Sequence, residues 1–309
     1  MRSRKRSDKF FRHVLGTDKS DLVYEEKDEL FDIGVSRSRD KAVILLGAFS
    51  KTSTDFRFIP ANDPNATWKI IVARQADHEY DVDHRGDLFY IRTNKGAKNF
   101  RVVTAPVSDP AEKNWKEFVA HRPAVKVEDI NLFADYAVLS EWENGLEQIE
   151  IVDFKQNQRH RIAFPEPVYS TGLSSNREFN TYDPALQLSI ADHAEFGFRL
   201  RHELARRRAC SNRRKCRADS TKTITKQNAS LRPRLTVQRF PMSVVYRKTV
   251  KLDGSAPALL YGYGSYGISI PPTFSARPSG VTRSRRGLCH WTHSGWRRSW
   301  ASPGAMPAA

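Results

Sequence analysis

The chain has 309 residues, of which 39% are hydrophobic and 11% aromatic, so it can bury a core in one large domain or two. Its formal net charge of +16 would favour an anionic partner such as nucleic acid, but no apolar run reaches the roughly 18 residues that a membrane span needs. Residues 1–16 (MRSRKRSDKFFRHVLG) are basic without the apolar stretch of a secretory signal, so we expect a cytoplasmic protein without a membrane partner.

Short segments rich in Val, Ile, Phe and Tyr follow one another through the first half of the chain and predict β-strands. Turn residues such as NDPN, HRGD, SDPAE and ENG separate them, and no long segment shows a 3.6-residue apolar period. The expected strands are residues 40–49, 54–61, 68–74, 87–94, 99–106, 135–143 and 146–154. Many short strands with regular turns indicate a sandwich, a barrel or a propeller.

A weak repeat favours the propeller among these folds. A turn aspartate followed by an apolar strand recurs at Asp40, Asp87 and Asp135, at intervals of 47 and 48 residues. About four strands fit into such an interval, which is the size of a propeller blade. We therefore expect consecutive four-stranded blades, three or four of them, over residues 20–182.

The positive charge is concentrated in two segments that differ from the rest of the chain. Residues 183–240 hold 14 Lys/Arg and 5 Asp/Glu, and residues 277–309 hold 6 Arg and no acidic residue. The remaining residues are nearly neutral, and all three cysteines lie within the two basic segments. Composition therefore separates these segments from a neutral body.

Five stretches of the neutral body resemble the prolyl oligopeptidase family. They are VYEEKDELFDIGVSRSRD (23–40), HEYDVDHRGDLFYIRTNKGAKNFRVVTAPVSDP (78–110), FPEPVYSTGL (164–173), PMSVVYRK (241–248) and DGSAPALLYGYGSYGISIPPTFS (253–275). The Tyr-Gly-Ser-Tyr-Gly form of the last stretch is more similar to oligopeptidase B than to prolyl oligopeptidase itself. The resemblance covers residues 9–182 and 241–276, about two-thirds of the chain.

The resemblance implies a mainly β chain, with part of a seven-bladed β-propeller at residues 1–182 and the first strands of an α/β-hydrolase domain at residues 241–276. Members of this family cleave short peptides with a Ser-Asp-His triad, and oligopeptidase B cuts after Arg or Lys. By the same resemblance, Tyr263 is the expected hydroxyl donor to the oxyanion of the tetrahedral intermediate. Tyr266 is expected to line the pocket for the residue preceding the cut bond. No cofactor or metal is expected.

The family's nucleophile is missing from this sequence. A hydrolase elbow has the pattern Gly-x-Ser-x-Gly, whereas Tyr263 stands two residues before Ser265 in the nearest candidate. In the family the triad comes downstream of this loop. We therefore expect this chain to be a fragment that is inactive as a peptidase on its own.

The two basic segments are interpreted as out-of-frame sequence. Codons compatible with residues 187–203, read one base later, encode residues of the kind that the family carries there, and residues 210–216 and 298–304 behave similarly. Since out-of-frame sequence has no pattern that buries one face, we expect residues 183–240 and 277–309 to lack a packed core and to be poorly ordered.

This interpretation also accounts for two motifs that otherwise indicate binding. Cys210 and Cys216 near His202 lack a second ligand pair at zinc spacing. The arginine run at residues 206–217 has no interleaved aromatic residues, so we expect no specific nucleic-acid partner.

His78 and His84 lie beside predicted turns and are interpreted as solvated.

Two functional classes remain open at this point. One is a serine oligopeptidase represented by a broken copy, whose intact form acts on short peptides. The other is a non-catalytic β-propeller that binds a partner. The sequence predicts neither the identity of such a partner nor an oligomeric state.

Overall fold

The computed structural model describes residues 6–164, 169–173 and 177–180. Beyond these it describes seven strands between residues 185 and 291, with a few positions beside residues 258–261. The elements described are strands, apart from one 3-10 turn, η1 (Glu112–Asn114). Among the described residues, no helix is long and apolar enough to cross a membrane.

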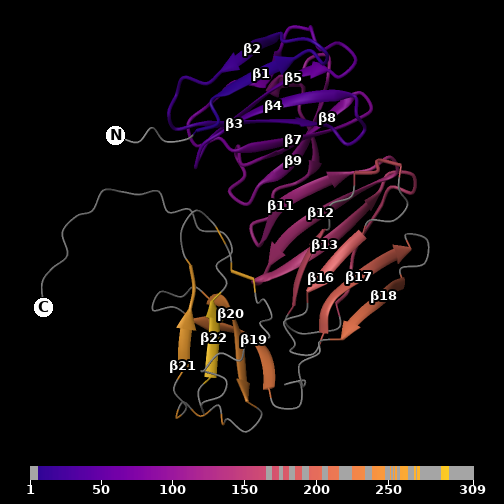
Figure 1. Ribbon diagram of the computed structural model, residues 1–309. Helices are drawn as coiled ribbons and strands as arrows, with labels where there is room; N and C mark the ends of the chain where they lie inside the picture. Colours follow the sequence, from indigo (N-terminus) through magenta and orange to yellow (C-terminus); the bar gives the residue numbers. More distant parts are fainter. Residues whose placement is uncertain are drawn as a thin grey trace, which may run out of the picture.

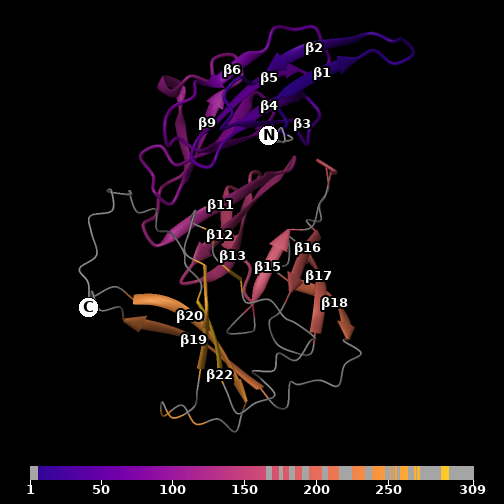
Figure 2. The same cartoon turned by 60° about the vertical axis from the view of Figure 1, so that its left-hand side comes forward.

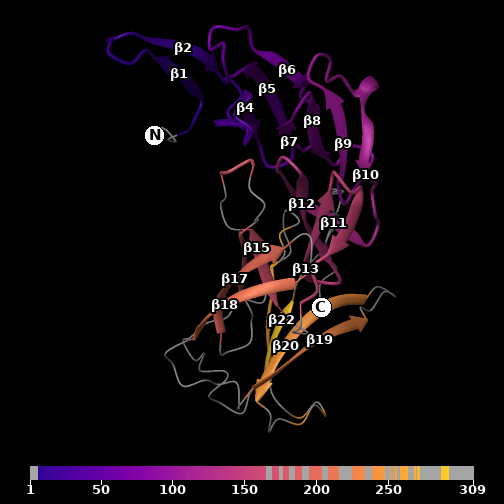
Figure 3. The same cartoon turned by 90° about the vertical axis from the view of Figure 1, so that its right-hand side faces the viewer.

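Four antiparallel sheets of four strands each follow one another along the chain (Figure 1). Each strand pairs with the next, and the sheets lie along an arc (Figures 1 and 3), as expected for propeller blades. The first sheet contains β3 (Asp32–Arg37), β4 (Val43–Phe49), β5 (Thr54–Pro60) and β6 (Lys69–Val72), and the second contains β7 (Tyr80–Arg85), β8 (Leu88–Thr93), β9 (Arg101–Pro106) and β10 (Lys116–Val119). The third contains β11 (Val125–Leu132), β12 (Tyr136–Glu143), β13 (Leu146–Asp153) and β14 (Gln158–Arg161), and the fourth contains β15 (Ser170–Leu173), β16 (Ala185–Ser189), β17 (Glu195–Glu203) and β18 (Arg208–Lys215).

The repeat seen in the sequence marks the second strand of each of the first three blades. β4, β8 and β12 begin 45 and 48 residues apart. The residue before each of these strands accepts a backbone hydrogen bond from the residue after the next strand. The three bonds are Ala61 N–Ala42 O at 2.8 Å, Val107 N–Asp87 O at 3.0 Å and Phe154 N–Asp135 O at 2.9 Å. The prediction of consecutive four-stranded blades is thereby confirmed.

Local sequence fixes the tight turn between β12 and β13. Asn144 and Gly145 have φ angles of 51° and 78°. A two-residue hairpin turn with both φ angles positive favours Asn-Gly, because these residues enter the left-handed region at the lowest cost. The predicted ENG turn therefore connects β12 and β13, the two strands of the third blade with the most paired residues.

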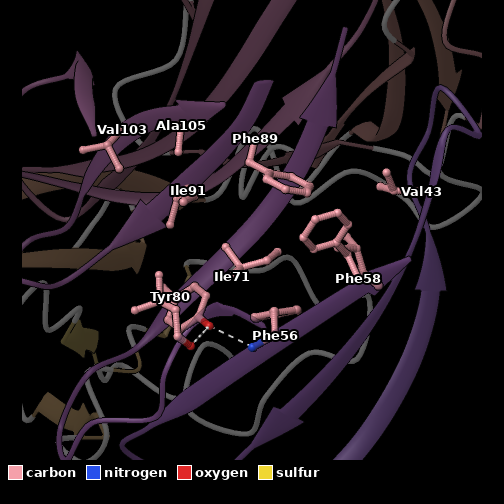
Figure 4. Packing of buried hydrophobic residues seen from close by; sticks show 11 residues of the cluster. Val43, Phe56, Phe58, Ile71, Tyr80, Phe89, Ile91, Val103 and Ala105 are labelled. Atoms are coloured by element: carbon pink, nitrogen blue, oxygen red, sulfur yellow. Dashed lines mark hydrogen bonds between the residues drawn. The ribbon is translucent and has the colours of Figure 1, made fainter. Parts of the chain in front are cut away.

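The hydrophobic core lies between successive blades rather than inside any one sheet. A cluster between the first and second blades includes Val43, Phe58 and Phe89 (Figure 4). A second cluster joins the second and third blades, and a third joins the third blade to β15 and its neighbours. Each inner blade therefore buries both of its faces.

The second blade shows how one strand serves two of these cores. In β8, Phe89 and Ile91 pack toward the first blade, whereas Tyr90 packs toward the third. Arg92 follows on the same side as Tyr90 and donates from Nε to the carbonyl of Val127 at 2.9 Å. Successive side chains of a strand point to opposite faces, so a short run of consecutive residues supplies both interfaces.

Tyr80 ties the first two blades together through its hydroxyl (Figure 4). The side chain is fully buried, its hydroxyl donates to Val72 O at 2.7 Å, and it accepts from Phe56 N at 2.8 Å. Thr54 adds a second link, because its hydroxyl donates to Tyr80 O and accepts from Tyr80 N, both at 2.7 Å. Burial raises the pKa of Tyr80 above its ordinary value, so the phenol stays protonated.

Tyr80→Phe should lower the free energy of unfolding by about 1–3 kcal/mol, because it leaves a buried amide and a buried carbonyl without their partner. Urea denaturation monitored by circular dichroism measures this change. Tyr263→Phe is the matched control, since its side chain is 44% exposed and should leave the midpoint unchanged. Equal midpoints for the two variants would contradict this role of Tyr80.

A hairpin of β1 (Lys9–His13) and β2 (Ser20–Glu25) precedes the first blade and projects from it (Figures 2 and 3). The segment that follows is fastened to the blade by Arg74. Its guanidinium pairs with Asp55 and Glu26, each at 2.6 Å, and lies 3.5 Å above the ring of Phe31. Asp55 is fully buried, and Arg74 together with Arg57, which pairs with its other oxygen at 2.5 Å, compensates the charge of the carboxylate.

The last described sheet differs from the blades. It contains β19 (Thr225–Pro233), β20 (Arg239–Arg247), β21 (Ala258–Tyr261) and β22 (Gly287–Trp291), in the order β19-β20-β22-β21. β21 and β22 are parallel, whereas the other pairs are antiparallel. Parallel strands need a crossover connection, which a blade does not contain. This sheet lies at the end of the arc opposite the β1–β2 hairpin (Figures 1 and 3).

Strands also occur in both basic segments. β16 to β19 lie within residues 183–240, and β22 lies within residues 277–309. The side chains of these five strands are outside the described residues, so the expected lack of a packed core stays a prediction. The proposed limits of the four segments of the chain also stay predictions.

Candidate functional site

The loop that follows β21 contains the predicted oxyanion donor. Tyr263 lies two residues after the end of this strand, and its side chain is 44% exposed. A parallel strand of a mixed sheet commonly carries functional side chains at its carboxyl end. Tyr266 lies outside the described residues, as does the rest of the segment 264–267. A phenol at this position has a hydroxyl that can donate to a developing negative charge.

A second polar region joins the first three blades where β7 and β11 end. Arg39, in the turn between β3 and β4, donates to Asn131 Oδ1 at 2.6 Å and to Leu132 O at 3.1 Å. Its guanidinium lies 4.2 Å from the centre of the Phe133 ring. Asp83 of the second blade accepts from Leu132 N at 3.2 Å. We call these residues, together with Asp40 and His84, the interblade rim.

The interblade rim corrects the interpretation of His84 as a solvated residue. His84 is 3% exposed, and its Nδ1 lies 2.6 Å from Asp40 Oδ2, which belongs to the first blade. The imidazole also packs edge-on against Phe89. The prediction failed because the acidic partner is 44 residues away, so the local turn pattern carries no sign of it.

His78 is also buried, at 4% exposure, and its interpretation as solvated is wrong too. Its Nε2 lies 2.8 Å from the hydroxyl of Thr93, and its ring stacks on Tyr80. Burial lowers the pKa of His78, and the nearby charge of Lys95 lowers it further. His78 is therefore a neutral core residue at pH 7.

Electrostatics within the rim support a structural role. Burial raises the pKa of Asp83, while amide hydrogen bonds from His84 and Leu132 and the charge of Arg39 oppose that increase. The groups of the rim thus bind one another across blade boundaries. The rim therefore stabilises the packing of the first three blades against one another.

The described part of the chain offers no metal centre. No group of three or more His, Cys, Asp and Glu side chains there is arranged to hold a metal ion. Cys210, Cys216 and Cys289 lie in segments whose side chains are outside the described residues.

Comparison with known families decides which propeller this is. The family model of the prolyl oligopeptidase N-terminal β-propeller domain matches residues 2–193. The chain belongs to the prolyl oligopeptidase family. This match covers the first three blades and the beginning of the fourth, and it confirms the resemblance found in the sequence. It ends before β21, so it does not test the roles of Tyr263 and Tyr266.

Relatives within the prolyl oligopeptidase family include dipeptidyl aminopeptidase BI of Pseudoxanthomonas mexicana, which is 38% identical over 85% of this chain and 36% of its own length. Protease 2 of Moraxella lacunata is 28% identical over 85% of this chain and 38% of its own length. The structure of oligopeptidase B from Trypanosoma brucei superposes with a TM-score of 0.82 at 24% identity, over 93% of this chain and 42% of that one. The chain thus spans about two-fifths of the length of the relatives it matches.

Proposed function

We propose that this chain forms part of the propeller and the first strands of the catalytic domain of a cytoplasmic serine peptidase that cuts short peptides after Arg or Lys. The observation that carries the proposal is the match of residues 2–193 to the family's propeller domain. The mixed sheet with a parallel pair at β21 and β22 supports the start of an α/β-hydrolase domain at residues 241–276, because such domains need crossover connections.

In this proposal the propeller covers the active site and admits only small substrates. The triad would come from a segment outside these 309 residues, with Ser as the nucleophile, His as the proton carrier and Asp as the group that orients the His. Tyr263 would donate to the oxyanion, and Tyr266 would contact the side chain preceding the cut bond. Binding energy from the loop would then be realised mainly in the transition state.

The relative named dipeptidyl aminopeptidase supports a second, related activity. An enzyme of that kind removes dipeptides from a free amino terminus, whereas an oligopeptidase cuts within a short peptide. Chromogenic peptides that end in Arg, with either a free or an acetylated amino terminus, distinguish the two activities. A strict requirement for the free amino group would favour the aminopeptidase.

The 309-residue chain should show no hydrolysis of an Arg-linked chromogenic peptide above a buffer blank, because its sequence has no Gly-x-Ser-x-Gly elbow. A repaired gene, with the two basic segments restored to the family's reading frame and the triad segment added, should give activity that a serine-directed inhibitor abolishes. Inhibitor-sensitive hydrolysis by the 309-residue chain would contradict the first expectation, and an inactive but folded repaired enzyme would contradict the second.

A further inference from the structure

A cavity of about 340 Å³ opens at the outer part of the second blade, next to the turn η1. Ligand pockets in proteins commonly have volumes of roughly 300–1,000 Å³, so this one is large enough for a small molecule of dipeptide size. Its walls combine two basic side chains, Lys95 and Arg101, with two acidic ones, Glu112 and Glu117, and an apolar surface from Val103 and Trp115. All of these residues lie within the described propeller.

The four charged groups differ in how closely they pair with one another. Lys95 donates to both carboxylate oxygens of Glu112 and to Gln75 Oε1, so these two charges satisfy each other. Arg101 and Glu117 are held much more loosely, with 4.0 Å between a terminal guanidinium nitrogen and Oε2. In the described part of the chain, the buried Nε of Arg101 has no acceptor. Because this Nε is buried, the groups left for a ligand are the terminal guanidinium nitrogens of Arg101 and the carboxylate of Glu117, whose side chains are 31% and 54% exposed.

The apolar wall is fixed by the core behind it. Val103 is 2% exposed and belongs to the cluster between the first two blades, against which Trp115 also packs. The indole N–H of Trp115 donates to Pro110 O at 3.2 Å. Its polar group is thereby engaged, and the part of the ring that lines the cavity is available for an apolar side chain.

We propose that this cavity binds a small zwitterion, a dipeptide with an apolar side chain. The ligand carboxylate pairs with Arg101, its ammonium pairs with Glu117, and its side chain lies against Trp115. A simple anion would face the carboxylates of Glu112 and Glu117, and a simple cation would face Lys95 and Arg101, so a ligand with both charges fits best. The site is non-catalytic and independent of the peptidase activity proposed above.

Isothermal titration of the 309-residue chain with the dipeptide Ala-Phe tests this site. The controls are N-acetyl-Ala-Phe, which lacks the ammonium, and Ala-Phe amide, which lacks the carboxylate. We expect each blocked form to bind at least tenfold more weakly than Ala-Phe. Equal dissociation constants for the three ligands would overturn the proposal. So would the absence of a binding signal for Ala-Phe at concentrations up to about 10 mM.

Two charge-removing variants assign the contacts. Arg101→Gln should abolish the preference for Ala-Phe over its amide, and Glu117→Gln should abolish the preference over the acetylated form, each without affecting the other preference. Arg159→Gln is the matched control, because Arg159 lies on β14 of the third blade and pairs with Glu150 at 3.8 Å. Retained discrimination in either folded cavity variant would overturn the assignment of its contact.

Discussion

Tyr263→Phe in a repaired full-length enzyme should lower kcat by roughly 10²-fold and leave KM nearly unchanged. The substitution keeps the ring and removes the hydroxyl, which in the proposed mechanism would donate to the oxyanion only as negative charge develops. Loss of one such donor costs about 3 kcal/mol of transition-state stabilisation. Steady-state kinetics with an Arg-linked chromogenic peptide measures both constants.

The comparison that isolates the effect of position is Tyr24→Phe. Tyr24 belongs to β2, and its hydroxyl donates to Glu26 Oε2 at 3.1 Å, so this variant loses the same atom at a site outside the catalytic loop. It should keep the kcat of the parent enzyme. An unchanged kcat for Tyr263→Phe would show that the loop after β21 is misassigned. A rise in KM alone would mean that Tyr263 binds substrate without stabilising the transition state.

Phe89→Ala should destabilise the chain by about 3–5 kcal/mol. Phe89 is fully buried between the first two blades, with its ring centre 4.8 Å from that of Phe58 and 5.5 Å from that of His84. Removing this ring leaves a cavity in a core that both blades share, and the cost combines lost burial with incomplete collapse of the cavity. The midpoint of urea denaturation reports the change.

Phe11→Ala provides the matched control, because it removes the same atoms from a side chain that is 52% exposed on the β1–β2 hairpin. It should change the free energy of unfolding by less than about 1 kcal/mol. If Phe89→Ala prevents folding, Phe89→Leu gives an intermediate measure with a smaller cavity. Equal losses for Phe89→Ala and Phe11→Ala would contradict a core placed between the blades.

The strands that the sequence predicted contain several apolar residues, and β8 among them is buried on both faces. β4, β8 and β12 were predicted within a few residues, because each contains an apolar run of four residues, at 43–46, 88–91 and 136–139. The repeat at Asp40, Asp87 and Asp135 then predicted the blade. A strand that is buried on both faces can be recognised from its composition alone.

The first strand of each blade was missed for the converse reason. β7 has the sequence YDVDHR and β11 has VKVEDINL. Both contain several charged residues and few apolar ones, so neither stands out as an apolar run. Some of these charged residues have partners in other blades, such as Asp83, which accepts a hydrogen bond from Leu132 N of the third blade at 3.2 Å. Contacts between residues so far apart in the chain are invisible to a local pattern.

In the candidate sites too, local motifs were predicted from the sequence and contacts between distant residues were not. Tyr263 was proposed through a family motif, and it lies two residues after the parallel strand β21, but its role stays a prediction. The interblade rim and the cavity beside Trp115 were not predicted. Arg39 acts on Asn131, which is 92 residues further along the chain, and only the closure of three blades brings the two together.

The two-sided packing of β8 also limits how this lineage can change in length. Deleting one residue inside that strand would move Phe89 and Ile91 to the face that Tyr90 and Arg92 now occupy, and two hydrophobic interfaces would be lost at once. Adding residues to an exposed turn such as 61–68 leaves both interfaces intact. Insertions and deletions that survive selection should therefore accumulate at the ends of the blades, while the length of each second strand stays constant.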